Sequence, residues 1–365
     1  MQTLKAFRGS ILLTIITLAA IGIATGSVAL VATTIVLAIL EVTLSFDNAV
    51  VNAKYLKKMS PLWQKLFLTV GILIAVFGMR LVFPIVIVAI TANLGLSEVV
   101  NLALNDSKQY AHELEAAKSA IYSFGGVFLL MIFLDWLFEE KEIKWLTPLE
   151  ATLEKLGKLN QLSVVIAGLL VLAGSSVVPA AEAKTVLLSG LIGLVTYLVV
   201  SGLDSFFDVD DDEEEPSGAA GAGSAVAMVG KAGFATFLYL EVLDASFSFD
   251  GVIGAFAIST NVLVIAAGLG IGAVFVRSMT VYLVRNGTLG HYRYLEHGAH
   301  WAIGALAIIL LLELKFHIPE AITGLLGLAF IAASYSSSIR ANRRDRAALP
   351  LDSAGEQREP ETAPV

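Results

Sequence analysis

Residues 28–53 read VALVATTIVLAILEVTLSFDNAVVNA, an apolar segment that is long enough to cross a membrane but carries two carboxylates, Glu41 and Asp47. A bilayer core about 30 Å thick needs roughly 20 apolar residues per helix. The segment therefore predicts a transmembrane α-helix with two ionisable groups inside it. Each such group costs about 2.5–3.5 kcal/mol to insert at the centre of a membrane helix, and groups of this kind mark candidate functional sites.

The whole chain shares this apolar character. Of its 365 residues 56% are hydrophobic and 15% are charged, and the mean hydropathy is +0.79. These values exceed those of ordinary soluble domains and predict an all-α polytopic membrane protein whose main partner is the lipid bilayer. The absence of cysteine excludes disulfides and thiolate metal ligands. The net charge of −8 comes largely from the run 208–215 and the C-terminal tail, so we expect no nucleic-acid partner.

Apolar runs between charged or turn-rich breaks predict about ten transmembrane helices. The first run follows Lys5 and Arg8 and is short. Residues 1–27 therefore predict a retained transmembrane helix or signal anchor, with a cleaved signal peptide as the alternative. The ten helices are expected near 10–25, 28–53, 64–91, 119–138, 161–178, 184–203, 233–256, 261–284, 297–314 and 318–338.

Two long breaks interrupt the apolar runs. Residues 92–118 are rich in polar and charged residues and predict an extramembrane or interfacial segment. Residues 204–232 begin with an acidic run and continue through Gly, Ala and Ser, which is the composition of a linker. We expect this cytoplasmic linker to separate a first membrane half, 28–203, from a second, 233–338. A basic and then disordered cytoplasmic tail is expected over 339–365.

The distribution of the 24 lysines and arginines predicts the orientation, because cytoplasmic loops carry an excess of positive charge. Lys54, Lys57 and Lys58 follow the second predicted helix, and Arg343 and Arg344 follow the last. Most of the positive charge then falls on one side if both termini are cytoplasmic. The expected location is the cytoplasmic membrane of a bacterial cell, crossed many times.

A short motif occurs twice in the chain. Residues 41–48 read EVTLSFDN and residues 241–250 read EVLDASFSFD, so Glu-Val and Ser-Phe-Asp recur. The copies lie five predicted helices apart and must point in opposite directions. An arginine follows one helix later in each half, Arg80 and Arg277. These features predict two inverted five-helix repeats with a shared substrate site near the bilayer midplane.

The repeated carboxylates predict a cation site. Burying five of them is unfavourable, and a bound cation offsets the cost because it lets them stay ionised. Oxygen ligands suit hard cations such as Mn²⁺, Mg²⁺ or Ca²⁺, which we expect as substrate, with no permanently bound cofactor. The predicted metal ligands are Glu41, Asp47, Asn48, Glu241, Asp244 and Asp250, and the candidate supporting residues are Ser45, Ser246, Ser248, Arg80 and Arg277.

The spacing of the carboxylates restricts how one ion can be bound. Glu41 and Asp47 are six residues apart, which is roughly 9 Å along a regular helix and about 120° around it. One ion cannot bridge them on a straight helix. Either the helix is broken near the motif or the site combines carboxylates of both repeats. Glu241 and Asp244 are three residues apart and face the same way.

Structural roles are the alternative for several of these residues. A membrane carboxylate can pair with Arg80 or Arg277 without taking part in transport, and we expect the arginines to be structural or gating partners more than ligands. Asp135 lies at the end of a predicted helix and is expected at the interface. Glu313 and His317 are expected near the opposite surface, in solvated positions.

At these motifs the sequence resembles the TerC family of integral membrane proteins, named for tellurium resistance, and in particular a branch catalogued as a domain of unknown function. The resemblance covers about residues 28–338. It implies a helical fold related to the LysE-type exporters and, from several members, Mn²⁺ efflux. The acidic motifs of the family fall on Glu41, Asp47 and Asn48 and on Glu241, Asp244 and Asp250. Gly251 stands where the family usually has a serine, so the site here is altered if that hydroxyl is a ligand.

Together these features predict an exporter that moves Mn²⁺ or a similar divalent cation outward by alternating access, with proton exchange as a hypothesis. We expect no enzymatic activity. An intramembrane aspartyl protease would need a Gly-x-Gly-Asp motif, which the sequence lacks, and the sequence has no Gly-x-x-x-x-Gly-Lys-Ser/Thr nucleotide loop. The rival function is a membrane scaffold or stress-response protein that recruits a cytoplasmic partner through the acidic residues 208–215. The sequence leaves the oligomeric state open, and a homo-oligomer is one alternative.

Overall fold

The computed structural model describes residues 2–159, 161–211, 230–259 and 261–348. In these ranges the chain forms helices and no strands. The first half contains α1 (Gln2–Thr25), α2 (Val28–Leu44), α3 (Phe46–Leu56), α4 (Pro61–Leu73), the π-helix η1 (Ile74–Val82), α5 (Phe83–Thr91), α6 (Leu96–Asn105), α7 (Ser107–Ala116), α8 (Lys118–Phe138), α9 (Thr147–Leu156), α10 (Leu162–Val177) and α11 (Ala180–Asp211). The second contains α12 (Gly230–Ile258), α13 (Val262–Arg285), α14 (Thr288–His291), α15 (Leu295–Leu312) and α16 (Glu320–Ala348).

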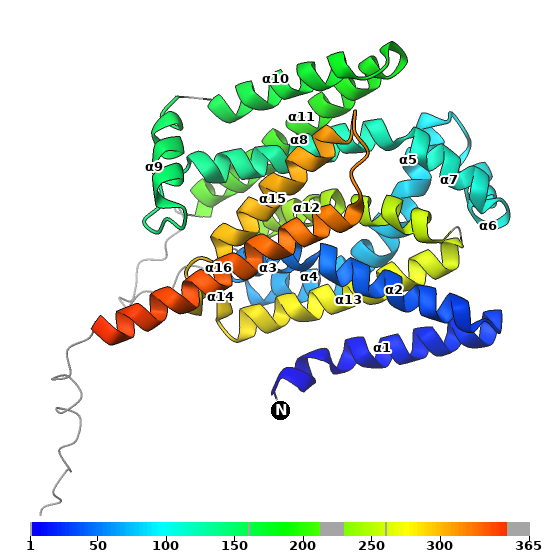
Figure 1. Cartoon of the computed structure of the whole chain (residues 1–365), viewed down its shortest axis with the longest axis horizontal. Helices are drawn as coiled ribbons and strands as arrows, with labels where there is room; N and C mark the ends of the chain where they lie inside the picture. Colours follow the sequence, from blue (N-terminus) through cyan, green and yellow to red (C-terminus); the bar gives the residue numbers. More distant parts are fainter. Residues whose placement is uncertain (1, 160, 212–229, 260, 349–365) are drawn as a thin grey trace, which may run out of the picture.

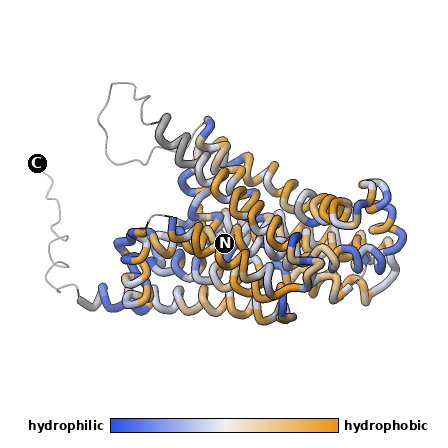
Figure 2. The backbone as a smooth tube through the Cα atoms, turned by 90° about the horizontal axis from the view of Figure 1, so that it is seen from above, coloured by the Kyte–Doolittle hydropathy of each residue, from blue (hydrophilic) through white to orange (hydrophobic). Residues whose placement is uncertain are grey.

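The long helices lie side by side across the view of Figure 1. Helix α1 lies at one edge against α13 and α2, and α10 packs on α11 toward the other edge. Between them α8 packs on α11 and α15, and α13 packs on α2 and α3. Figure 2 shows apolar residues along the middle of the bundle and hydrophilic residues gathered toward its two ends. This distribution suits a bundle whose middle lies in hydrocarbon.

The helices confirm a polytopic membrane protein. Seven of the described helices are long and apolar enough to cross a membrane, or eight if α2 and α3 form one broken span. Each of the ten predicted segments coincides with a helix or a broken helix, although α10, with 16 residues, is shorter than a typical span.

The second predicted helix is broken at the acidic motif. Helix α2 ends at Leu44, Ser45 leaves the helical conformation with φ −101° and ψ 18°, and α3 begins at Phe46 at an angle of 52° to α2. Glu41 lies in the last turn of α2, where the helix dipole favours a cation, and Asp47 lies in the first turn of α3, where it favours an anion. Of the two alternatives that the spacing allows, a broken helix is therefore present in the first repeat, whereas α12 is continuous.

The next predicted span is continuous but changes its hydrogen-bond period. Helix α4 passes into η1, nine residues of π-helix, and then into α5. A π-helix has i to i+5 hydrogen bonds, is rare, and frequently lies at functional sites. Arg80 lies in its last turn. The unusual backbone thus positions one of the two arginines that the repeat singled out.

Three helices extend past the boundaries that were predicted for the linker and the tail. Helix α11 continues to Asp211, and α12 begins at Gly230. Helix α16 continues to Ala348, beyond the predicted start of the tail. Residues 212–229 and 349–365 lie outside the described residues. The 92–118 segment forms the short helices α6 and α7.

Three residues that were predicted near helix ends differ in the exposure of their side chains. Asp135 is exposed near the end of α8 and accepts a hydrogen bond of 2.6 Å from the Tyr197 hydroxyl. His317 is also exposed. The expected solvated role of Glu313 is wrong. Its side chain is only 2% exposed because it pairs with Lys118 at 3.1 Å.

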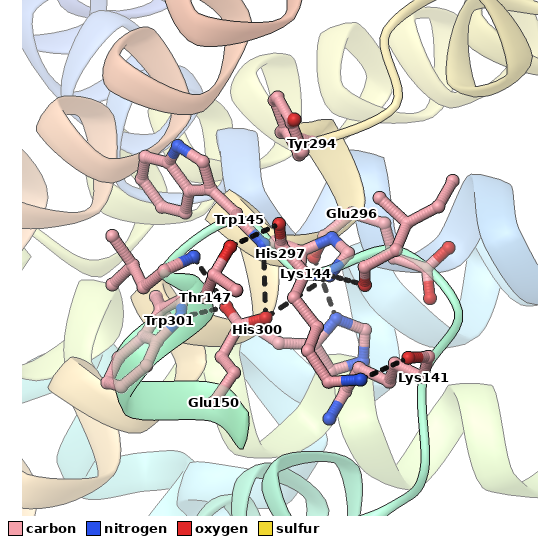
Figure 3. A network of polar contacts seen from close by, with 12 residues as sticks. Lys141, Lys144, Trp145, Thr147, Glu150, Tyr294, Glu296, His297, His300 and Trp301 are labelled. Atoms are coloured by element: carbon pink, nitrogen blue, oxygen red, sulfur yellow. Dashed lines mark hydrogen bonds and ion pairs between the residues drawn. The ribbon is translucent and has the colours of Figure 1, made fainter. Parts of the chain in front are cut away.

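A buried polar network attaches the segment after α8 to α15 (Figure 3). Glu150 of α9 is buried and accepts hydrogen bonds from the backbone N–H groups of Trp145 (3.1 Å) and Leu146 (3.3 Å) and from the indole of Trp301 (3.2 Å). The Nε2 atom of His297 lies 3.6 Å from the same carboxylate. Sequence analysis did not find this network, because its acidic residue lies in a stretch of sequence that is rich in charged residues.

Changing Glu150 to Gln should weaken the attachment of this segment to α15. Glutamine carries an amide NH₂ group, which would face the N–H groups whose hydrogen bonds Glu150 now accepts. We therefore expect a loss of about 1–3 kcal/mol of stability. Limited trypsin cleavage after Lys141 and Lys144 should become faster. Glu142→Gln, at an exposed position of the same loop, is the matched control and should leave the cleavage rate unchanged. Equal rates in the two variants would contradict the role given to Glu150.

Candidate cation site

The break between α2 and α3 opens on a small buried cavity of about 20 Å³. Both Glu41 and Asp47 line it, so the bend brings together two carboxylates that a straight helix would separate. A space of this size holds about one water molecule, or one ion without its hydration shell. The remaining lining residues come from α2, α12, α15 and α16: Leu44, Ser45, Phe247, Gly251, Ala302, Leu306, Thr323 and Gly327.

Oxygen atoms dominate the polar lining. Ser45 Oγ donates a 2.9 Å hydrogen bond to Glu41 Oε1, and Asp47 Oδ1 accepts one of 2.9 Å from the Asn48 backbone N–H. Thr323 Oγ1 is buried and has no hydrogen-bond partner. A buried polar atom without a partner costs about 1–3 kcal/mol, which a ligand in the cavity would offset. Thr323 is a candidate ligand that sequence analysis missed, because it lies in neither copy of the motif.

The two repeats meet at Asn48 and Asp244. The side-chain amide Nδ2 of Asn48 in α3 donates a 2.5 Å hydrogen bond to Asp244 Oδ1 in α12, and both residues are buried. The Oδ1 atom of Asn48 has no partner. The two copies of the motif are therefore in direct contact at these side chains. The unpartnered amide oxygen of Asn48 is of a type that hard cations accept as a ligand.

Each glutamate of the motif faces the arginine of its own half. Arg80 donates to Glu41 Oε1 and, at 2.5 Å, to the carbonyl of Ala75. Arg277 Nη2 lies 3.5 Å from Glu241 Oε1. All four charged side chains are buried. The predicted pairing of the membrane carboxylates with these arginines is thus present in both halves, and it compensates buried charge that would otherwise be costly.

The other predicted site residues show no described contact with the carboxylates of the motif. Ser246 donates to the carbonyl of Val242 (3.0 Å) and lines a different, apolar cavity of about 280 Å³ between α5, α8, α11 and α12. Ser248 is buried with an unpartnered hydroxyl. The side chain of Asp250 lies outside the described residues. Among the side chains that the structure describes, no three His, Asp or Glu residues form a group able to hold a metal ion together.

Three glycines pack directly against Glu41 or Glu241, and sequence analysis missed two of these glycines. A Cβ atom built on Gly272 would lie 2.5 Å from Cβ and Cγ of Glu41, and one on Gly251 would lie 2.9 Å from Glu41 Oε2. A Cβ on Gly71 would lie 2.4 Å from Glu241 Oε1. The absence of a side chain at Gly251 thus leaves room beside the Glu41 carboxylate. Helix packing with glycine at the contact is typical of membrane helices.

Changing Gly272 to Ala should destabilise the protein by about 1–3 kcal/mol. The added methyl group meets the Cβ of Glu41 and the carbonyl of Ala38 at 3.1 Å, and neither atom can move away without shifting α2. Thermal unfolding in detergent measures the effect. Gly168→Ala is the matched control, because nothing lies within 4 Å of the added atom. The packing argument fails if both variants unfold at the wild-type temperature.

Comparison with known proteins places the chain in a family but gives no function. No curated protein and no solved structure matches it. One family model matches residues 46–345, which cover α3 to α16 and therefore Asp47, Asn48 and the whole second copy of the motif, while Glu41 lies just outside. The chain belongs to this family, which is described as protein of unknown function DUF475.

Proposed function

We propose that this protein is a membrane transporter that exports Mn²⁺ or a similar hard divalent cation. The observation that carries the proposal is the cavity at the break between α2 and α3, where Glu41 and Asp47 face one ion-sized space beside the unpartnered hydroxyl of Thr323. Discontinuous helices with ionisable groups at their broken ends are a recurring way to build ion sites in secondary transporters.

The resemblance to the TerC family supports Mn²⁺ as the substrate and outward movement as the direction. The donors at the cavity are carboxylates and hydroxyls, which suit Mn²⁺, Mg²⁺ and Ca²⁺ better than soft metals. In this proposal the protein lies in the bacterial cytoplasmic membrane with both termini inside. The cation passes between the repeats through Asn48 and Asp244, and protons move in exchange.

Flux measurements on the purified chain in liposomes test this function. Wild type should carry Mn²⁺ faster than empty liposomes, and an imposed pH gradient should change the rate. Asp47→Asn should lower the flux to background, whereas Asp135→Asn, at the exposed end of α8, should leave it unchanged. Wild-type liposomes that carry Mn²⁺, Mg²⁺ and Ca²⁺ no faster than empty ones would refute transport.

The scaffold alternative is tested with the same material. Deleting residues 212–224 removes most of the acidic and small-residue linker and leaves the described helices in place. A transporter should keep its basal flux after this deletion. A scaffold would instead lose its cellular phenotype on deletion while showing no flux before it.

A further inference from the structure

The two buried ion pairs differ in the hydrogen bonds that each glutamate accepts. Glu41 Oε1 accepts hydrogen bonds from both Arg80 and Ser45. In the other pair the closest approach of Arg277 to Glu241 is 3.5 Å, and neither oxygen of Glu241 nor either terminal nitrogen of Arg277 has a hydrogen-bond partner. Glu241 is therefore neutralised by a nearby charge but is not bonded to it.

Arg277 has a second contact that does not involve a carboxylate. Its guanidinium carbon lies 3.6 Å from the centre of the Phe67 ring in α4, and Phe67 is fully buried. A cation above an aromatic face is attracted by the ring quadrupole, most strongly where water is excluded. This contact exists together with the Glu241 pair, so it would continue to stabilise the guanidinium charge if Glu241 were engaged elsewhere.

A divalent cation and this guanidinium compete for the same negative charge. Asp244 lies three residues after Glu241 on the same face of α12, and Arg277 interacts electrostatically with both. Arginine stays protonated in proteins, so it cannot reduce the repulsion by losing a proton. A cation that reaches Asp244 from Asn48 must therefore displace Arg277 from Glu241 or be repelled by it.

We propose that Arg277 is a tethered competitor of the transported cation, which neutralises Glu241 in the cation-free state and, when the cation binds, leaves Glu241 while keeping its contact with Phe67. This inference rests on the proposed function. It explains why a cation site contains a buried guanidinium: the returning arginine displaces the ion and leaves no bare carboxylate in the membrane. Arg80, which is hydrogen-bonded to its glutamate, is a fixed partner by contrast.

Equilibrium binding of Mn²⁺ to the purified full-length chain in detergent tests the competition. Arg277→Gln removes the competing charge and should tighten Mn²⁺ binding by at least about tenfold, a lower bound for one charge at short range in a protein. The same variant should transport more slowly, because the ion is no longer displaced. Arg277→Lys keeps the charge and should change the dissociation constant by less than about threefold.

Phe67→Leu should have the opposite effect, weakening Mn²⁺ binding by roughly threefold to tenfold, because the guanidinium loses the contact that would stabilise its charge away from Glu241 and stays at that carboxylate. Phe237→Leu is the matched control. Its ring packs on the edge of Phe67, 6.3 Å away, so the variant loses a similar volume and keeps the ring beneath Arg277. Damage to packing alone would weaken binding equally in both leucine variants.

The outcomes separate the inference from the function. If wild type binds none of Mn²⁺, Mg²⁺ and Ca²⁺, the proposed function fails, and the inference with it. If wild type binds but Arg277→Gln binds with equal or lower affinity, the competition is overturned while transport stands. Should Arg277→Gln not fold, the phenylalanine pair decides: weaker binding in Phe67→Leu alone supports the competition, and any other pattern overturns it.

Discussion

Changing Asp244 to Asn is expected to lower cation flux by roughly 100-fold, a loss of the size that follows removal of groups at metal sites. Asp244 is buried, and its Oδ1 accepts the 2.5 Å hydrogen bond from Asn48 that joins the two repeats. An asparagine at 244 keeps the shape but removes the charge that attracts a cation between the repeats. Flux into liposomes, measured at equal protein content, gives the effect.

Exchanging Asn48 and Asp244 with each other provides the control. The double variant Asn48→Asp and Asp244→Asn keeps one carboxylate and one amide at the same contact. We expect it to recover flux to within about tenfold of wild type, because the charge and the hydrogen bond are both restored. A single Asp244→Asn variant that transports at the wild-type rate would show that this contact is structural.

Changing Glu41 to Gln is expected to destabilise the protein by about 3–5 kcal/mol, because it leaves the Arg80 guanidinium buried without its carboxylate. The side chain of Arg80 is only 3% exposed, so water cannot replace the lost partner. Denaturation in mixed detergent micelles, followed by near-UV circular dichroism, measures the loss. The variant should also lose transport, because Glu41 lines the cavity.

Removing both charges separates the two effects. In the double variant Glu41→Gln and Arg80→Met no unpaired charge remains, and most of the stability should return. Transport should stay absent, since the cavity still lacks one carboxylate. If the double variant is no more stable than Glu41→Gln alone, the ion pair is not what the glutamate contributes to the fold.

Much of the fold follows from sequence because one strong signal specifies it. Long apolar runs predict membrane helices, and each of the ten predicted segments is helical. The short repeat around Glu41 and Glu241 correctly selected residues that are buried together in pairs with Arg80 and Arg277. It succeeded because an ionisable side chain in hydrocarbon needs a partner, and few partners were available in the chain.

The remaining features depend on tertiary contacts that leave no periodic trace. Thr323 is one of many threonines, and only the approach of α16 to α2 places it at the cavity. Gly71 and Gly272 resemble any other membrane glycine until the glutamates that they face are known. Glu150 belongs to a charged stretch of sequence that composition alone describes as solvated, and in the structure it contacts Trp301 of α15.

The π-helix η1 has a consequence for the lengths that homologous chains can have. It holds an extra residue in a turn, so the position of Arg80 beside Glu41 depends on this wide turn as well as on the number of residues before it. Deleting one residue there would change the helical phase of everything after it unless the segment also returned to α-helical spacing. A homologue shorter by one residue at this point would therefore keep the pair only if this stretch were α-helical.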